Sequence, residues 1–198
     1  MTHSQETAQE AALQTAGSMV VETALGFAGF AWSAAGLTRL YLFQHDRAAV
    51  ERRLERLGAA PLAGGSAVPA WVAALADGIR AYAAGETVDF SSVPVDLAGI
   101  DDFRLAIYAA TRRLGYGETT TYGELARLAG HAGLPRETGQ AMGSNPVPLI
   151  IPCHRVLAAG GKVGGFSAPG GSIAKQRMLE LEGVRVGPPP APQQSFAF

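Results

Sequence analysis

The chain contains one cysteine, and the residues around it are the first candidates for chemistry. Cys153 follows Pro152 and precedes His154 and Arg155, inside an apolar, β-type run from Ile150 to Val156. Thiolate is the reactive form of cysteine, and a free thiol is only slightly ionised near neutral pH. His154 could accept the thiol proton, directly or through water, while Arg155 adds positive potential and Pro152 removes a backbone donor. A lone cysteine is otherwise core filler, so these neighbours favour a nucleophile.

The elements that must position this thiol are predicted to be helices. Asp101 to Leu114 carries acids in its first turn and arginines in its last turn, which favours a helix. Thr121 stands three residues before Glu124, so it predicts a capping box that opens a helix over Tyr122 to Ala129. A second short helix after Leu134 would complete a helix-turn-helix.

The first half of the chain predicts a small antiparallel sheet with helices packed on it. Its expected strands are Met19–Val21, Gly29–Trp32 and Thr38–Phe43, and its expected helices are Ala48–Leu57 and Trp71–Ala84, the second stopped by Gly85. Val93 to Gly99 has no helical period and predicts a connection, with a domain boundary near Ala98. The fold class is α/β (α+β), with a flexible N-terminus (1–17), an α/β domain (18–98), a helical domain (99–185) and a flexible tail (186–198).

Composition restricts the class of protein. The 198 residues are 47% hydrophobic and carry a formal net charge of −1, which is typical of a globular chain with a real core. Acids outnumber bases before Ile100 and bases outnumber acids after it, so the second half is better suited to a polyanion. Glu22 and glycines interrupt the apolar stretch from Met19 to Leu37, so no membrane span is predicted. One cysteine allows no internal disulfide, which favours a reducing, cytoplasmic location, and no motif requires a metal or cofactor.

Several short motifs occur together around the cysteine. Pro152-Cys153-His154-Arg155 follows Tyr122-Gly123-Glu124-Leu125-Ala126, Arg136 and Asn145-Pro146, and precedes Gly164-Gly165-Phe166-Ser167 and Leu181-Glu182-Gly183. In type and spacing they resemble the active-site region of the O6-alkylguanine-DNA alkyltransferases, the methylated-DNA–protein-cysteine methyltransferases. The resemblance is close from Gly99 to Gly183 and looser over Tyr82, Gly85 and Phe90. It implies an N-terminal domain on a ribonuclease-H-like sheet and a C-terminal domain that holds the helix-turn-helix and the cysteine.

The resemblance also implies a reaction, in which Cys153 takes the alkyl group from O6 of guanine. The product is a thioether, so the protein is consumed in one turnover. His154 is implied to relay the proton and Glu182 to orient the imidazole, with Glu180 as the competing carboxylate. Tyr122 is implied to protonate the leaving guanine. Asn145 is implied to assist catalysis, and as a turn-former it could serve both purposes.

The same resemblance assigns residues to DNA and to the substrate. Arg136 is implied to enter the duplex and fill the gap left by the extruded nucleotide, and the residues implied to contact DNA with it are Thr121, Gly139 and Ala141. The residues implied to line the pocket of the flipped base are Met142, Pro148, Val156, Phe166 and Ser167. Phe166 stands where some relatives carry tyrosine, and Pro135, Glu137 and Thr138 depart from the small, apolar residues that are commoner beside the arginine.

The expected partner is double-stranded DNA containing O6-alkylguanine. The protein is expected to be a monomer and to have no membrane partner. Two alternatives remain open. One is a non-enzymatic sensor of alkyl lesions with the same fold, against which the presence of Cys153 argues. The other is a Cys-His hydrolase, for which no oxyanion-hole signature is found. The sequence does not distinguish among alkyl groups or decide whether O4-alkylthymine is accepted.

Overall fold

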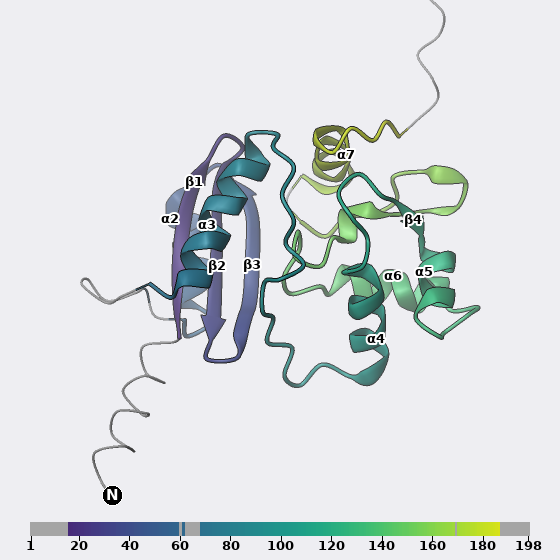
Figure 1. Cartoon of the computed structure of the whole chain (residues 1–198), viewed down its shortest axis with the longest axis horizontal. Helices are drawn as coiled ribbons and strands as arrows, with labels where there is room; N and C mark the ends of the chain where they lie inside the picture. Colours follow the sequence, from purple (N-terminus) through teal and green to yellow (C-terminus); the bar gives the residue numbers. More distant parts are fainter. Residues whose placement is uncertain (1–15, 60, 62–67, 169, 187–198) are drawn as a thin grey trace, which may run out of the picture.

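The computed structural model describes residues 16–59, 61, 68–168 and 170–186. In this part of the chain a three-stranded sheet with two helices lies beside a group of helices built from the second half (Figure 1). This is the mixed α/β architecture that the sequence predicts. Most of the two ends predicted to be flexible lies outside the described residues, although Gly17 already belongs to the first strand.

The sheet is an antiparallel meander of β1 (Gly17–Thr23), β2 (Gly26–Ser33) and β3 (Gly36–Gln44), in that order. The three strands contain the three predicted segments, which confirms the predicted sheet. Gly26 and Gly36, with φ of 111° and 144°, each follow a two-residue turn, and such a φ favours glycine.

Two helices cover opposite faces of this sheet (Figure 1). The predicted helices are observed as α2 (Arg47–Glu55) and α3 (Ala70–Ala83). Side chains alternate along a strand, so Ala31 packs against α2 while its neighbour Phe30 packs in the core that α3 covers. Helix α2 lies close to the sheet at Gly29, where a Cβ would come within 2.1 Å of a Val50 methyl carbon.

Helix α3 ends where the sequence predicts, because Gly85 with φ of 91° terminates it. The predicted connection Val93 to Gly99 has no helix and runs beside β3. Its backbone bonds to both backbone groups of Leu37 in that strand. The Leu37 N–H donates to Pro94 O at 2.9 Å, and the Asp96 N–H donates to Leu37 O at 2.9 Å. The chain is therefore held to the sheet before it enters the second half.

The second half is mainly helical. Its elements are α4 (Asp102–Thr111), β4 (Thr120–Thr121), α5 (Tyr122–Leu128), α6 (Pro135–Gly143), η1 (Cys153–Arg155), β5 (Val156–Leu157), η2 (Ala159–Gly161) and α7 (Gly171–Leu181). The helix predicted over Asp101 to Leu114 is observed as α4, and Asp101 is its N-cap, since its side chain accepts from the Arg104 N–H at 2.9 Å. Helices α5 and α6 pack on each other where the helix-turn-helix is predicted. Helix α7 was not predicted.

The predicted capping box at α5 is half formed. The Thr121 hydroxyl accepts from the Glu124 N–H at 3.2 Å, as expected. The Glu124 carboxylate does not return to the cap, because it pairs with the Arg127 guanidinium through bonds of 2.9 and 2.5 Å. The reciprocal half of the box is therefore wrong, and an ion pair within the helix replaces it.

The prediction of a β-type run at the cysteine is also wrong. Cys153 to Arg155 form a turn of 3-10 helix, and only Val156 and Leu157 pair as a strand, in parallel with β4. The preceding backbone finds its partner in a side chain, because the Asn145 amide donates to Ile151 O at 2.8 Å. A backbone group satisfied in this way needs no neighbouring strand.

The two halves of the chain share one apolar core. Phe30 of β2, Ile79 of α3, Ile107 of α4 and Ile151 before η1 belong to the same buried cluster. The cysteine lies in this cluster too, with 4% of its surface exposed. The core therefore fixes the site against the sheet as well as against the helices.

Candidate active site

The cysteine is placed by a rigid turn that follows α6. Asn145 closes the turn twice: its amide donates to Ile151 O, and its carbonyl oxygen accepts from the Val147 N–H at 3.0 Å. Leu149 has a φ of 76°, a conformation that costs a non-glycine residue energy and is common at functional sites. The Cys153 N–H then donates to Ile151 O at 2.7 Å. The sequence predicted both a turn and a catalytic role for Asn145, and the structure shows the turn.

Behind the thiol lies a buried carboxylate with five hydrogen-bond donors. Glu182 accepts from His154 Nε2 at 2.7 Å, from Arg155 Nε and Nη2 at 2.8 and 2.9 Å, from the Tyr82 hydroxyl at 3.0 Å and from the Gly117 N–H at 3.1 Å. Burial alone would raise the pKa of Glu182, but these bonds and charges lower it to about 2. The carboxylate is therefore ionised at neutral pH. Glu180, the competing carboxylate, is exposed and bonds to Gln176.

This carboxylate decides which nitrogen of His154 can act as a base. Burial lowers the pKa of His154, so the ring is neutral at physiological pH. Its Nε2 lies against an ionised carboxylate that can only accept, and hence carries the ring proton. The lone pair is then on Nδ1, which is buried and has no hydrogen-bond partner in the described part of the chain. Nδ1 is thus the basic atom of the site.

The thiol itself is protonated in the resting protein. Burial raises the pKa of Cys153, while a hydrogen bond from Asn145 and the charge of Lys175 lower it in part. The sequence assigned positive potential to Arg155, and its charge does help to lower the pKa of His154. Arg155 Nε and Nη2 both bind Glu182, whose charge offsets that of the guanidinium. Lys175 is the cation whose charge helps to lower the pKa of the thiol.

Sequence reasoning missed Lys175, which is fully buried on α7. Its Nζ donates to Val156 O at 2.5 Å and to the Tyr122 hydroxyl at 3.5 Å, and it lies 5.5 Å from the centre of the Tyr122 ring. Burial lowers the pKa of Lys175 to about 8. Burial also raises the pKa of Tyr122, which keeps the phenol protonated at neutral pH. A proton donor and a cation are therefore paired beside the cysteine.

Cys153 and Tyr122 line the same cavity, which has a volume of about 460 Å³ and which we call the thiol cavity. The predicted pocket residues that also line it are Met142, Phe166 and Ser167, and Gly139 contributes to its wall. A second hollow of about 220 Å³, on the sheet side of Cys153, is lined by the predicted residue Pro148 together with Asn145 and β3. Val156 is fully buried and lines neither space.

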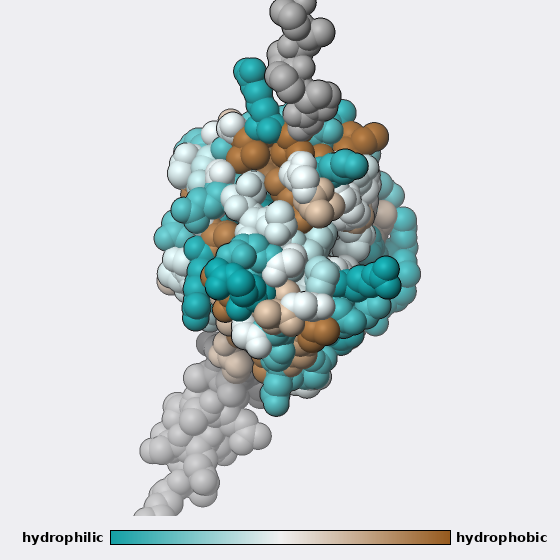
Figure 2. All heavy atoms as spheres, turned by 90° about the vertical axis from the view of Figure 1, so that its right-hand side faces the viewer, coloured by the Kyte–Doolittle hydropathy of each residue, from teal (hydrophilic) through white to brown (hydrophobic). Residues whose placement is uncertain are grey.

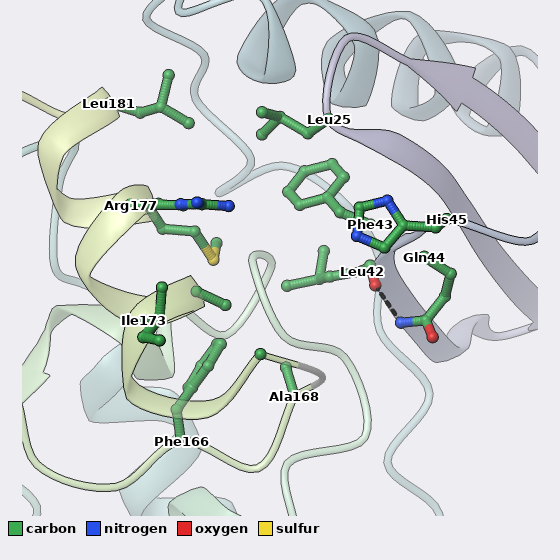
Figure 3. Close-up of a pocket in the computed structure, with 13 residues that line it drawn as sticks. Leu25, Leu42, Phe43, Gln44, His45, Phe166, Ala168, Ile173, Arg177 and Leu181 are labelled. Atoms are coloured by element: carbon green, nitrogen blue, oxygen red, sulfur yellow. Dashed lines mark hydrogen bonds between the residues drawn. The ribbon is translucent and has the colours of Figure 1, made fainter.

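A third hollow, of about 220 Å³, lies beyond Phe166 between the end of β3 and α7 (Figure 3). Leu42 and Phe43 bound it on one side and Ile173 and Leu181 on the other, so its lining is mostly apolar. Phe166 lines all three spaces. Phe166 therefore forms part of the wall between the thiol cavity and the hollow that lies between β3 and α7.

The residues predicted to contact DNA do not all share one surface. Arg136 is exposed in the first turn of α6, and Thr121 is half-buried as the cap of α5. A Cβ at Gly139 would meet open space. The Ala141 side chain is 1% exposed and packs in the core, so it does not face outward with the others. Figure 2 shows the side of the molecule that carries α5, where hydrophilic and hydrophobic residues are interspersed.

The described residues contain no group of three or more His, Cys, Asp or Glu side chains that could hold a metal ion. Among the same residues, none of the helices is long and apolar enough to cross a membrane.

The site combines a buried thiol, a neutral histidine bonded to an ionised carboxylate, and a phenol on the thiol cavity, in a mixed α/β protein. Residues 102–184 match the family model described as the DNA-binding domain of 6-O-methylguanine DNA methyltransferase. A methylated-DNA–protein-cysteine methyltransferase of Methanothermobacter thermautotrophicus is 33% identical over 156 residues, which are 79% of each chain. The chain therefore belongs to the methylated-DNA–protein-cysteine methyltransferase family.

Further relatives extend this comparison. The crystal structure of Mycobacterium tuberculosis OGT in complex with DNA is 34% identical, with a TM-score of 0.66 over 83% of this chain and 91% of that one. A DNA base-flipping protein of Thermus thermophilus is 39% identical over 108 residues, 54% of this chain and 71% of its own. Mycobacterial methylated-DNA–protein-cysteine methyltransferases are 44% identical to this chain over 109 residues. This stretch is 55% of this chain and 64% of those relatives, which is less than two thirds of their length.

Proposed function

We propose that this protein repairs alkylated DNA by moving an alkyl group from O6 of guanine to its own Cys153. The observation that carries the proposal is the thiol cavity, whose wall holds the cysteine, with His154 and Glu182 behind it and Tyr122 on the same cavity. A buried, protonated thiol is a poor nucleophile, so it needs a base at the moment of attack. The site supplies that base and also an acid.

In the proposed reaction His154 Nδ1 accepts the thiol proton, directly or through one water molecule. The Cys153 sulfur attacks the alkyl carbon in line with the bond to O6, so that a carbon–sulfur bond forms as the carbon–oxygen bond breaks. The positive charge that develops on the imidazole is stabilised by Glu182, which accepts from Nε2. The product is a thioether, which no group in the site can cleave, and the protein acts once.

The leaving group is a guanine that would depart as an anion. Tyr122 protonates the ring as the bond breaks, and the Lys175 ammonium, 3.5 Å from its hydroxyl, stabilises the phenolate and can replace the proton. The ordinary pKa values of the two groups are 10.0 and 10.5, whereas burial here raises the pKa of Tyr122 and lowers that of Lys175 to about 8. The ammonium is therefore the stronger acid, which favours proton transfer from Lys175 to the phenolate.

Duplex DNA is the proposed partner. O6 of a stacked guanine cannot reach Cys153, because only 4% of the surface of this residue is exposed. The nucleotide must leave the stack, at a cost of a few kcal/mol. We assign α5 and α6 as the helix-turn-helix and Arg136, exposed at the start of α6, as the side chain that fills the gap. The resemblance to an OGT chain solved with DNA supports this docking.

A second candidate is a non-enzymatic protein that flips the lesion and does not repair it. The base-flipping relative and the raised pKa of Cys153 favour it. One experiment separates the two: duplex DNA containing O6-methylguanine is incubated with excess protein, and unmodified guanine is measured by enzymatic digestion and mass spectrometry. Alkyl transfer predicts restored guanine with wild type and none with Cys153→Ser, whereas base flipping alone predicts bound but unrepaired DNA with both.

A further inference from the structure

The buried carboxylate of the site is bound by a side chain from the first half of the chain. Tyr82 lies on α3, which covers the sheet, and it is fully buried. Its hydroxyl bonds to Glu182 Oε1 at 3.0 Å across 100 residues of sequence. Because an ionised carboxylate can only accept, the phenol is the donor in this bond. The α3 helix therefore reaches the group that orients His154.

Tyr82 and His154 share the same carboxylate oxygen. Oε1 accepts from the phenol, from His154 Nε2 at 2.7 Å and from Arg155 Nη2 at 2.9 Å. Each donor partly neutralises the negative charge of Oε1. A hydrogen bond from one donor therefore weakens the hydrogen bonds that Oε1 accepts from the others. The Tyr82 ring also lies edge-on to the imidazole, with centroids 6.4 Å apart. The tyrosine thus touches His154 and competes with it for one oxygen.

We propose that Tyr82 is a positioning residue for the chemistry of Cys153, acting through Glu182 on His154. Its hydroxyl holds the carboxylate in the orientation that keeps the proton on Nε2. It also disperses charge on Oε1, so the imidazole stays neutral with Nδ1 free to accept a proton. The first half of the chain then contributes to reactivity as well as to support.

Removing the Tyr82 hydroxyl should change the pKa of His154 in a definite direction. In Tyr82→Phe, Oε1 loses one hydrogen-bond donor, so more of its negative charge acts on His154. The imidazolium form of His154 is then stabilised, and the pKa of His154 rises. Among the described residues, the titratable and charged groups around this ring are Glu182 just after α7, Lys175 of α7, Cys153 and Arg155 of η1, and Tyr82 of α3. The variant changes only the last of these.

The neighbouring tyrosine provides a matched control. The Tyr116 hydroxyl donates to Leu181 O at 2.7 Å, next to Glu182 in sequence, and its ring is edge-on to Tyr82 at 6.3 Å. Tyr116→Phe therefore removes a phenol bond from the same region without touching the carboxylate. A merely structural effect would act similarly in both variants.

The test is the titration of the His154 imidazole by NMR of ¹⁵N-histidine-labelled protein, which needs no DNA. Tyr82→Phe is expected to raise the midpoint by about half a unit or more, roughly a threefold change in the protonation equilibrium, and Tyr116→Phe to leave it unchanged. Equal midpoints in wild type and Tyr82→Phe, or equal shifts in both variants, would overturn the proposal.

A second arm tests the link to catalysis, which rests on the proposed function. The acid limb of single-turnover methyl transfer should move to higher pH in Tyr82→Phe by the same amount. If the chain transfers no alkyl group, this arm gives no rate while the NMR arm still decides the role of Tyr82. Should Tyr82→Phe not fold, 3-fluorotyrosine at position 82 strengthens the donor and is expected to shift the midpoint downward; no shift would refute the proposal.

Discussion

Replacing Glu182 by glutamine tests whether the buried carboxylate organises the site. The two side chains have nearly the same shape, but five donors point at the carboxylate and an amide has one acceptor oxygen. Whichever way the amide faces, its NH₂ meets at least two of these donors, and Arg155 is left without its counter-charge. Breaking a buried ion pair from one side costs about 3–5 kcal/mol, which for a chain of this size lowers Tm by roughly 6–20 °C.

The pH dependence of this loss identifies its origin. Because the pKa of Glu182 falls from 4.5 to about 2 on folding, the stabilisation is complete above 4.5 and is lost as the pH falls through about 2. Thermal unfolding of wild type and Glu182→Gln, followed by circular dichroism from pH 7.5 to pH 2, should give melting curves that converge in this interval.

Glu180→Gln is the control, since that carboxylate is exposed and bonds only to Gln176 among the described residues. Its effect should stay within about 0.5 kcal/mol. An unchanged Tm in Glu182→Gln at pH 7.5, or a loss that does not vary with pH, would refute the reasoning.

Three further predictions address the thiol, the buried cation and the sheet. Asn145→Asp replaces a donor to the thiol by a negative charge, so the pKa of the cysteine should rise and the pH profile of its alkylation by iodoacetamide should move upward; an unmoved profile would contradict the contact. Lys175→Met should remove a pH dependence: because burial lowers the lysine pKa from 10.5 to about 8, wild type should gain roughly 2 kcal/mol over the variant between pH 8 and 10 in urea unfolding. Gly29→Ala should cost about 1–3 kcal/mol through its clash with Val50, whereas Gly123→Ala, which meets no atom, should be neutral or slightly stabilising in the same assay.

The sequence predicted the sheet and most helices because their apolar residues follow simple periods. Glycines at turns and an aspartate or threonine cap then marked several ends of these elements. Pairing across the sheet also followed, because short strands with two-residue turns have few alternatives.

The site was only partly predictable. Lys175 precedes Gln176 and Arg177, and such a polar run looks solvent-exposed. A signal was nevertheless present: Met178, Leu179 and Glu182 follow it by three, four and seven residues, which places all four on one buried helix face. The contact between Tyr82 and Glu182 had no local signal, since it joins helices from the two halves of the chain.

The most direct test of the central claim is the mass of the protein after reaction. Wild type is incubated with duplex DNA containing O6-methylguanine, digested and sequenced by tandem mass spectrometry. The account predicts the gain of one CH₂ on Cys153 alone, in a one-to-one ratio with the guanine restored. Restored guanine without that adduct, or several guanines restored by each protein molecule, would contradict it.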